Sequence, residues 1–320
     1  MRGDPTTKVG RIQFVGVVVV AAVVAGMVPL LVGPQATAAP RCPAVSVTTA
    51  AESPALTGWA ENLTFDGGGN LWVSRVLDNT VERFDRAGHR TAAVRVVAPG
   101  AIRTGPDGLL YIASGDTTLN MIPGSPRIGT IVRLDPSRPR PVAQVFATGL
   151  GMPNGMDFDD AGFLYVADGN LGVLRIDRRG AIDTAWSRRA PKNLALSPTV
   201  NGTSTNGIVV LGANLYVTLT MSLTGRILRV PIGDPGAVSI AADVTRPVPG
   251  VLDDLVALDG RTLAVTMTTG QIATVDLPTH EVCVAGVGQP VTAIAQRPGR
   301  PDLLIVGTES GALLAVSARR

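Results

Sequence analysis

Apolar and polar residues alternate in short stretches along most of this chain, and turns rich in Gly, Asp and Asn separate the stretches. The clearest example is residues 153–177, PNGMDFDDAGFLYVADGNLGVLRID, and similar stretches occupy residues 60–75, 205–220 and 252–267. Alternation with a period of two residues, bounded by turn residues, is typical of short β-strands. The regular recurrence of one pattern further predicts a fold built from repeated units.

The repeated units predict a closed ring of small β-sheets. Inner strands are expected to begin near Leu63, Ala101, Met156, Ile208, Leu255 and Ala293. Their spacing of roughly 40–50 residues is that of four-stranded propeller blades. The sequence therefore predicts an all-β protein, a six-bladed β-propeller over residues 39–320. In the third unit we expect strands at residues 155–158, 163–167 and 173–177, and an outer strand at residues 182–186.

The last unit offers only three strands, at residues 291–296, 303–307 and 312–316. A spare alternating segment, residues 44–49, lies near the start of the predicted propeller. We expect this N-terminal segment to supply the outer strand of the last blade, because closure in this way leaves no open sheet edge between the first and last blades.

Residues 1–38 have the pattern of an export signal. Lys8 and Arg11 give the segment a charged start, residues 14–32 are apolar, and residues 36–38 (ATA) provide a small-residue cleavage site. We therefore expect a secreted protein. The apolar run is longer than most signal cores, so an uncleaved membrane anchor at residues 14–32 is the alternative, and contact with a membrane is expected only in that case.

Cys42 and Cys283 are the only cysteines of the chain. In an exported protein, two thiols so far apart in the sequence are expected to form a disulfide. Such a bond would tie the start of the propeller to a strand expected at residues 281–284. The alternative is two buried free thiols.

The charge of the chain does not indicate a nucleic-acid partner. The formal net charge is only +3, Lys8 and Lys192 are the only lysines, and no basic run is interleaved with aromatic residues. A nucleic-acid-binding domain carries a concentrated basic patch. We therefore expect a small-molecule partner, and nothing in the sequence indicates an oligomeric state.

Alignment of the repeats places oxygen-bearing side chains at one equivalent position in four of them. These four residues, called the polar quartet below, are Glu61, Asn154, Asn206 and Asp253. The position immediately precedes an expected inner strand, which in a propeller directs side chains to the mouth of the central channel. Asp254 adds a further carboxylate, whereas the second and sixth units carry Gly100 and Thr292 there.

Converging carboxylates repel one another and are costly to bury unless a cation compensates them. Carboxylate and amide oxygens without His or Cys favour a hard ion, and several mixed ligands favour Ca²⁺ over Mg²⁺ or Zn²⁺, although another divalent metal is an alternative. His89 and His280 are expected in turns between outer strands, away from the axis. The other interpretation is that the polar quartet consists of ordinary turn residues around a water-filled channel.

The repeats and the polar quartet together resemble those of the six-bladed calcium-dependent propellers. These are the gluconolactonase and regucalcin (senescence marker protein) family and the related diisopropylfluorophosphatases and paraoxonases. The resemblance extends over residues 61–316 and is clearest at residues 153–177. It implies a calcium site, because Glu, Asn, Asn and Asp on blades one, three, four and five match the pattern of the phosphatases and paraoxonases.

The resemblance supports an ion site more fully than it supports a particular reaction. The regucalcin-like group binds sugar lactones through Arg and Asn beside the second blade, where this chain has Ala98-Pro99-Gly100. The fourth-blade Asp that serves that group as the base is Asn206 here. Paraoxonases use a pocket His, which neither histidine of this chain matches. These departures argue against a sugar lactone as substrate.

The sequence therefore predicts a Ca²⁺-dependent hydrolase of a lactone, ester or phosphotriester, in which the ion polarises the substrate oxygen. Asp253 is the candidate general base or nucleophile, and Asp254 is the reserve. Loops at residues 116–128 and 188–204 are expected to overhang the mouth of the channel. Further residues expected in loops on that face, lining a substrate pocket or forming ordinary turns, are Asp168, Asn170, Thr220 and Met221.

Two other functions fit the repeats. A non-enzymatic propeller like the NHL-repeat domains, serving as a binding or scaffold module, needs no chemistry and is the main alternative. In an intermediate case the ion is purely structural. A lyase or synthase of the streptogramin-lyase or strictosidine-synthase type ranks third, because the first relies on a His and the second tolerates loss of the metal residues, which are retained here.

Overall fold

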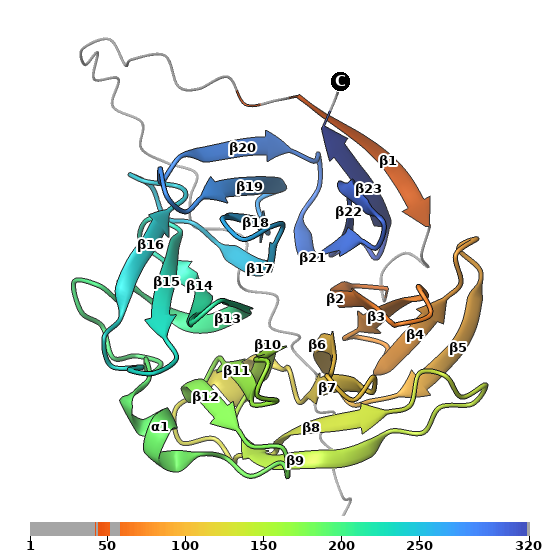
Figure 1. The fold of residues 1–320 in the computed structure, drawn as a ribbon, viewed down its shortest axis with the longest axis horizontal. Helices are drawn as coiled ribbons and strands as arrows, with labels where there is room; N and C mark the ends of the chain where they lie inside the picture. Colours follow the sequence, from red (N-terminus) through yellow and green to blue (C-terminus); the bar gives the residue numbers. More distant parts are fainter. Residues whose placement is uncertain (1–41, 43, 52–57, 319–320) are drawn as a thin grey trace, which may run out of the picture. The chain divides into compact units, whose positions relative to one another are not determined.

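Six β-sheets form a ring around a central axis in the computed structural model (Figure 1). The structure describes residues 42, 44–51 and 58–318, and the predicted export signal at residues 1–38 lies outside them. The ring lies within the compact unit Pro40–Arg320. This arrangement confirms the predicted six-bladed β-propeller. Among the described residues, no helix has both the length and the apolar character that a membrane span requires.

Five of the blades contain four antiparallel strands each, and in four of these the strands are consecutive in the chain and ordered from the axis outward. The first contains β2 (Ala60–Phe65), β3 (Leu71–Arg75), β4 (Thr80–Phe84) and β5 (Arg90–Arg95). The second contains β6 (Pro99–Thr104), β7 (Leu110–Ser114), β8 (Gly129–Leu134) and β9 (Gln144–Leu150), with the short 3₁₀-helix η1 (Thr118–Met121) after β7. The fourth contains β13 (Gly202–Leu211), β14 (Asn214–Ser222), β15 (Arg226–Pro231) and β16 (Ser239–Asp243). The fifth contains β17 (Leu252–Ala257), β18 (Thr262–Met267), β19 (Gln271–Asp276) and β20 (Val282–Gly286).

The sixth blade is completed by the N-terminal strand, as the sequence predicts. Its strands are β21 (Val291–Arg297), β22 (Arg300–Thr308), β23 (Leu313–Ala318) and, outermost, β1 (Val45–Ala51). β1 runs antiparallel to β23 along the outside of the ring (Figure 1). The predicted disulfide is also confirmed: Cys42 bonds to Cys283 of β20, with their Cα atoms 5.3 Å apart. The bond therefore ties the closing segment to the fifth blade.

The third blade differs from the prediction. Its sheet contains only β10 (Pro153–Phe158), β11 (Leu164–Asp168) and β12 (Gly172–Ile176). The outer strand expected at residues 182–186 is wrong, because the short helix α1 (Thr184–Arg189) occupies most of that segment. Asp183 caps this helix by accepting a hydrogen bond from the Trp186 backbone N–H at 3.0 Å. An N-terminal cap of this kind satisfies a backbone donor that an outer strand would have paired.

Trp186 explains why the helix replaces the strand. Its ring packs edge-on against Tyr165, with the ring centroids 5.3 Å apart, and its Nε1 donates to the Ile232 carbonyl at 2.7 Å. The side chain thus spans the third and fourth blades, so burial of one aromatic residue decides the local conformation.

The hydrophobic core lies between neighbouring blades. Trp72 of the first blade belongs to one buried cluster with Ile102 and Ile112 of the second. Tyr165 of the third blade similarly packs with Val217 of the fourth. Layers of this kind hold the inner strands in place around the axis, and they give the residues at the channel mouth a rigid base.

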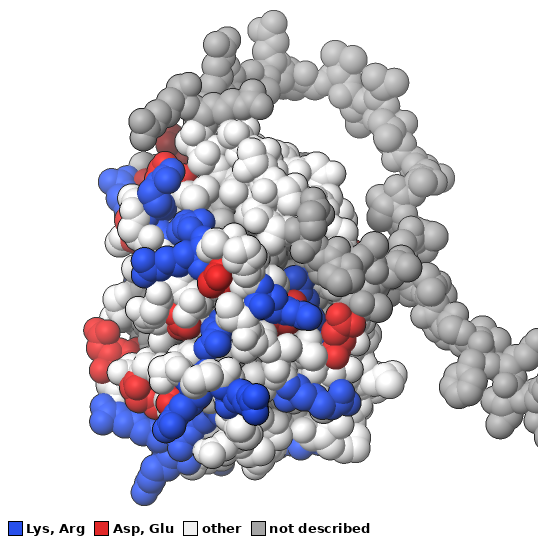
Figure 2. Space-filling view, turned by 90° about the vertical axis from the view of Figure 1, so that its right-hand side faces the viewer, with Lys and Arg blue, Asp and Glu red and all other residues white. Residues whose placement is uncertain are grey.

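Arginines on the outside of the ring form contacts that stabilise the fold. The side of the molecule that carries the first and last blades shows Arg interspersed with Asp and Glu (Figure 2). Arg90 forms an ion pair with Glu82, and the Arg83 guanidinium lies 5.6 Å from the centre of the Trp72 ring. Pairs of this kind use the apolar stems and the charges of arginine together.

Candidate metal centre at the channel mouth

The polar quartet lies at irregularities in the inner strands. Each residue falls inside its strand, in β2, β10, β13 or β17, whereas the sequence placed it just before the strand. The pairing register shifts at this place in all four strands, at residues 60–62, 153–156, 205–208 and 252–255. A bulge inserts a residue without a direct partner and re-aims its side chain. The bulges therefore explain how strand residues can turn their polar groups to the mouth.

Hydroxyl groups hold the bulged backbone in position. In three blades a Ser or Thr of the second strand donates a hydrogen bond to an inner-strand carbonyl of the next blade. The pairs are Ser74 to Gly100 (2.6 Å), Thr218 to Asp253 (2.6 Å) and Thr266 to Thr292 (3.0 Å). These bonds fix one inner strand against the next close to the polar quartet, and they satisfy buried backbone acceptors.

Side chains of the polar quartet meet across the mouth. Asn154 Nδ2 donates to Glu61 Oε1 at 3.4 Å, and the indole Nε1 of Trp59 donates to Glu61 Oε2 at 2.7 Å. Asn206 lies beside Asp253, and its hydrogen bond to that carboxyl partly opposes the rise in pKa that burial causes there. All four quartet residues are buried, with at most 8% of their surface exposed. The structure therefore brings together the side chains that the sequence singled out.

Asn206 holds an acceptor oxygen with no partner. Its Nδ2 donates to Thr220 Oγ1 at 2.9 Å, which fixes the orientation of the amide. Its Oδ1 is buried and accepts no hydrogen bond from any described residue. A buried acceptor left in this state costs free energy, and it indicates a ligand or an ordered water. Thr220, predicted to line a pocket, thus serves to orient a member of the polar quartet.

The carboxyls of the site are buried and repel one another, so their ionised forms are unfavourable. Burial, followed by repulsion from Asp116 and Asp253, raises the pKa of Glu61 well above its usual value. Burial, followed by repulsion from Asp254 and Asp116, likewise raises the pKa of Asp253. Burial and repulsion therefore destabilise the ionised form of both groups, and a nearby positive charge would offset this.

Asp116 is a member of the site that the sequence analysis missed. It follows β7, in the loop predicted to overhang the mouth. Burial raises its pKa to about 7, and its carboxyl forms a side-chain hydrogen bond with Glu61. Its place in the chain corresponds to Asn170 of the third blade, since YIASGD and YVADGN align. That alignment is the signal in the sequence that could have identified it.

Asp254 faces away from the polar quartet. Its Oδ1 accepts from Arg103 Nη2 at 3.1 Å, and its Oδ2 accepts from Asn62 Nδ2 at 3.0 Å and from the Ile294 backbone N–H at 3.3 Å. Only 2% of the Asp254 side chain is exposed. These bonds join the first, second, fifth and sixth blades, so the carboxylate serves the fold, with no acceptor turned to the mouth.

Asp168 and Asn170 also have bonds that account for them. Asp168 is fully buried and accepts four backbone N–H groups, those of Gly151, Met152, Asn170 and Leu171, at 2.8 to 3.1 Å. Asn170 Nδ2 donates to the Asn120 carbonyl at 2.6 Å and so holds the loop that carries Asp116. Both residues therefore shape the loops of the mouth.

Exposed apolar side chains gather on loops of the same face. Met221, one of the predicted pocket residues, exposes 59% of its surface. By the order of the strands, loops that enter inner strands and loops between second and third strands share the face of the mouth. The exposed large apolar residues on such loops include Leu119, Ile122, Leu194, Leu196 and Leu223. Thr220 and Met221 lie near the end of β14, just before such a loop, and not in the loop where the sequence placed them. A gathering on one face is more informative than single exposed residues.

Both histidines lie where the sequence predicts. His89 is exposed between β4 and β5, where its Nδ1 pairs with Asp85. His280 is exposed between β19 and β20, and its Nδ1 lies 3.0 Å from the Ala241 carbonyl oxygen. Neither belongs to the mouth.

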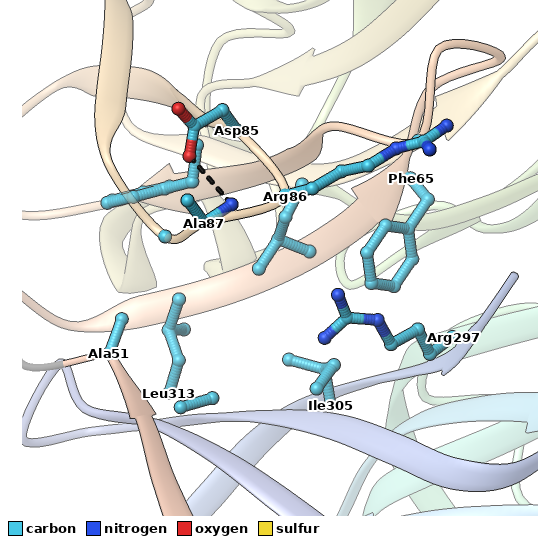
Figure 3. Close-up of a pocket in the computed structure, with 13 residues that line it drawn as sticks. Ala51, Phe65, Asp85, Arg86, Ala87, Arg297, Ile305 and Leu313 are labelled. Carbon is cyan, nitrogen blue, oxygen red and sulfur yellow. Dashed lines mark hydrogen bonds between the residues drawn. The ribbon is translucent and has the colours of Figure 1, made fainter. Parts of the chain in front are cut away.

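A cavity of about 100 Å³ lies between the first and last blades, apart from the mouth (Figure 3). Arg86 and Arg297 extend beside it, and Phe65, Ile305 and Leu313 contribute apolar walls (Figure 3). A second cavity, lined by residues such as Pro106 and Arg178, also contains no residue of the polar quartet. The candidate site therefore depends on the chemistry of the mouth and not on the size of a cavity.

The donor set fits a hard cation in its chemistry. Within the described ranges, no three His, Cys, Asp or Glu side chains are gathered closely enough to hold an ion by themselves. The candidate set is mixed, however, because two of its members are amides. Buried carboxyls with raised pKa values and one unpartnered amide oxygen together suit a hard ion such as Ca²⁺.

Comparisons with known proteins identify the fold. Neither a scan against protein-family models nor a search of curated proteins found a match. Among solved structures, a calcium-binding regucalcin from Agrobacterium tumefaciens is 18% identical, with a TM-score of 0.59, over 82% of this chain and 92% of that one. A proposed gluconolactonase is 15% identical, with a TM-score of 0.60, over 86% of this chain and 92% of that one.

A third similar structure carries a different activity. It is a catalytically inactive His-to-Ala variant of virginiamycin B lyase from Staphylococcus aureus, solved with quinupristin. It is 12% identical, with a TM-score of 0.58, over 85% of this chain and 99% of that one. The chain thus shares the six-bladed propeller of gluconolactonase-like, regucalcin-like and lyase proteins. A shared fold at this identity does not fix the function, which has to be argued from the site.

Proposed function

We propose that this protein is an exported, calcium-dependent hydrolase of a lactone, an ester or a phosphotriester. The observation that carries the proposal is the buried, unpartnered Oδ1 of Asn206, a residue that lies beside Asp253, whose carboxyl pKa is raised by burial. A scaffold propeller has no need for such an arrangement, because each element of it costs stability.

The polar quartet would hold the ion, with Glu61 and Asp253 supplying charge and Asn154 and Asn206 supplying neutral oxygens. A bound Ca²⁺ would supply positive charge that polarises a carbonyl or phosphoryl oxygen and stabilises the negative charge developing there. Trp59 orients Glu61 through its 2.7 Å hydrogen bond, and Thr220 orients Asn206. The ligands are thereby held in place before substrate arrives.

Asp253 is the residue proposed to act on the substrate. As a general base its carboxylate would accept a proton from the attacking water, and as a nucleophile it would attack the substrate directly. Its backbone carbonyl is held by Thr218, and its side chain lies beside Asn206. Asp254 is not a comparable candidate, because Arg103, Asn62 and the Ile294 N–H occupy its oxygens.

The exposed apolar residues on the mouth-face loops favour a substrate with an apolar substituent. Leu119, Leu194 and Leu223 each expose more than half of their surface. Such side chains lose unfavourable contact with water when an alkyl or aryl group covers them. A polar sugar lactone would give no comparable gain, which agrees with the absence of the sugar-binding residues at positions 98–100.

A hydrolysis screen tests the proposal. The purified full-length protein is assayed with an aryl ester, an alkyl-substituted lactone, gluconolactone and a phosphotriester, each with Ca²⁺ and with a chelator. We expect Ca²⁺-dependent turnover of an apolar substrate, its loss in Asp253→Asn, and its retention in Glu309→Gln, a charge change on the same face. Turnover that persists in the chelator, or in Asp253→Asn, would contradict the proposal.

One observation favours a non-enzymatic module with a structural ion. The quartet residues expose at most 8% of their surface, and neither of the two cavities described above contains any of them. In that case the ion would tie blades together at the axis. Calcium-dependent stabilisation with no turnover of any substrate in the screen would support this second function.

A further inference from the structure

The cavity between the first and last blades has apolar walls. It has a volume of about 100 Å³, and Phe65, Leu71, Ile305 and Leu313 line it (Figure 3). Ile305 and Leu313 belong to the buried cluster that joins these two blades, and only 1% of each residue is exposed. An apolar group that entered this cavity would therefore be removed from water, which is favourable.

Arg297 brings a positive charge to this cavity. It is the last residue of β21, whereas Thr292, at the position equivalent to the polar quartet, lies near the start of the same strand. The five positions between them correspond to about 16 Å along a strand. The Arg297 guanidinium points in among the residues that line the cavity (Figure 3). The charge therefore belongs to a place well separated from the channel mouth.

The guanidinium of Arg297 has no partner. Within the described ranges it forms no ion pair, hydrogen bond or cation–π contact, although the residue is half-buried. The other buried or half-buried arginines of those ranges, which all have a partner, are Arg75, Arg83, Arg103, Arg133, Arg175 and Arg226. A charge taken partly out of water without a counter-charge is unfavourable, so this arrangement points to an anion from outside the chain.

Arg86 supplies a second guanidinium beside the cavity. Its Nη2 donates to the Gly68 carbonyl at 3.0 Å, and no acidic side chain of the described residues pairs with it. Asp85 also lines the cavity, but its Oδ1 accepts the backbone N–H groups of Ala87 and His89, both at 2.9 Å. This carboxylate is thus engaged within its own turn, and neither arginine is neutralised by it.

The combination of charges is specific to the closure of the ring. Arg86 has a counterpart in the third blade, Arg178, which also donates to a backbone carbonyl, at 2.6 Å. Arg297 has no counterpart beside Arg178, because the second blade carries Gly105 at the equivalent position of its inner strand. Of the two cavities described above, the one at the ring closure therefore combines an unpartnered guanidinium with apolar walls.

We propose that this cavity binds a small organic anion, a monocarboxylate with a short alkyl chain. The carboxylate pairs with the planar fork of Arg297, and Arg86 adds a second positive charge. The alkyl chain lies against Phe65, Ile305 and Leu313. Since a cavity of about 150 Å³ accommodates a benzene ring, one of about 100 Å³ suits a chain of about three or four carbons.

The test measures binding of butyrate to the full-length protein. A chelator is present, so that no ion at the channel mouth binds the carboxylate. Isothermal titration calorimetry gives the dissociation constant for the wild type and for Arg297→Gln and Arg86→Gln. Arg178→Gln is the matched control, because it removes the equivalent charge from another blade. Butan-1-ol, which lacks the charge, and inorganic phosphate, which lacks the alkyl chain, are the comparison probes.

We expect one butyrate site with a dissociation constant of about 1 mM. Arg297→Gln should weaken binding by about tenfold or more and Arg86→Gln by about threefold, whereas Arg178→Gln should leave it unchanged. Butan-1-ol and inorganic phosphate should each bind at least about tenfold more weakly than butyrate. Arg297→Lys, which keeps the charge without the fork, should weaken binding less than Arg297→Gln.

Three results would overturn the proposal. These are no binding of butyrate by the wild type, equal binding by the wild type and Arg297→Gln, and binding of phosphate as tight as that of butyrate. Thermal melts check that each variant is folded. If Arg297→Gln does not fold, the comparison passes to Arg297→Lys, and an unchanged affinity there overturns the proposal. Because calcium is absent throughout, the proposed hydrolase function is neither supported nor contradicted by these results.

Discussion

Asn154 Nδ2 lies 3.4 Å from Glu61 Oε1, although 93 positions separate the two residues. They belong to β10 and β2, in the third and first blades, so this contact passes over the second blade. The inner strand of that blade carries Gly100 at the quartet position, and a Cβ added there would lie 3.1 Å from the Pro153 carbonyl oxygen. The mouth of the propeller is thus a place where non-neighbouring blades meet through polar atoms.

Asp253 and Asp254 are adjacent in sequence, but substitutions of the two residues are predicted to have different effects. Asp254→Asn leaves the buried Arg103 charge without its partner, so we expect a loss of about 3 kcal/mol or more in the free energy of unfolding. Stabilisation by Ca²⁺ should remain. Asp253→Asn should reduce stabilisation by Ca²⁺ and turnover, with a smaller effect on the stability of the metal-free protein.

Urea unfolding with and without Ca²⁺ measures both effects. An Asp254→Asn variant as stable as the wild type, or one that has lost its response to Ca²⁺, would show that the two residues have been assigned the wrong roles.

The stability of the metal-free protein should fall as pH rises towards neutrality. The folded-state pKa of Asp116 is raised from 3.8 to about 7, and burial raises those of Glu61 and Asp253 too. A raised pKa means that the folded state holds more protons than the unfolded state. The protonated carboxyls therefore contribute to the free energy of unfolding below about pH 4, and this contribution is lost as pH rises through about 7.

Thermal melts in a chelator should therefore show a melting temperature that falls between about pH 5 and pH 8. Added Ca²⁺ should remove the fall, because the ion compensates the ionised carboxylates. Asp116→Asn should flatten the profile in the chelator. A melting temperature that stays level or rises over this range in the wild-type protein would contradict the raised pKa values of the buried carboxyls.

The disulfide should contribute strongly to stability, since Cys42 and Cys283 are 241 positions apart. In the chain-entropy model, a loop of this length corresponds to about 5 kcal/mol, an upper value for the effect. We expect Cys42→Ser and Cys283→Ser each to lower the unfolding midpoint, and reduction to have no further effect on either variant. A wild-type midpoint unchanged by full reduction would contradict this role.

The fold could be predicted because blade strands alternate strictly and turns separate them. The one wrong element, the outer strand at residues 182–186, had an alternating pattern too short to exclude a helix. What decided it was a tertiary contact, the packing of Trp186 between the third and fourth blades, and such a contact is not visible in a local pattern.

The candidate site could be predicted only in part. The polar quartet was visible because its four members share one repeat position, whereas Asp116 belongs to a loop with no repeated counterpart carboxylate. Asp168 shows the converse limit, because this carboxylate at the end of β11 accepts hydrogen bonds from backbone N–H groups of the neighbouring loops. Hydrogen-bond partners separate a ligand from a turn residue, and a sequence does not contain them.

The most direct test of the account is the melting temperature of the full-length protein in a chelator and then with excess Ca²⁺, for the wild type and for Glu61→Gln. A ligand at about 100 times its dissociation constant stabilises the folded state by about 2.7 kcal/mol, which for a chain of this size corresponds to a rise of about 5 °C. We predict such a rise for the wild type and its loss in Glu61→Gln. An unchanged wild-type melting temperature, or an equal rise in both proteins, would contradict an ion site at the channel mouth.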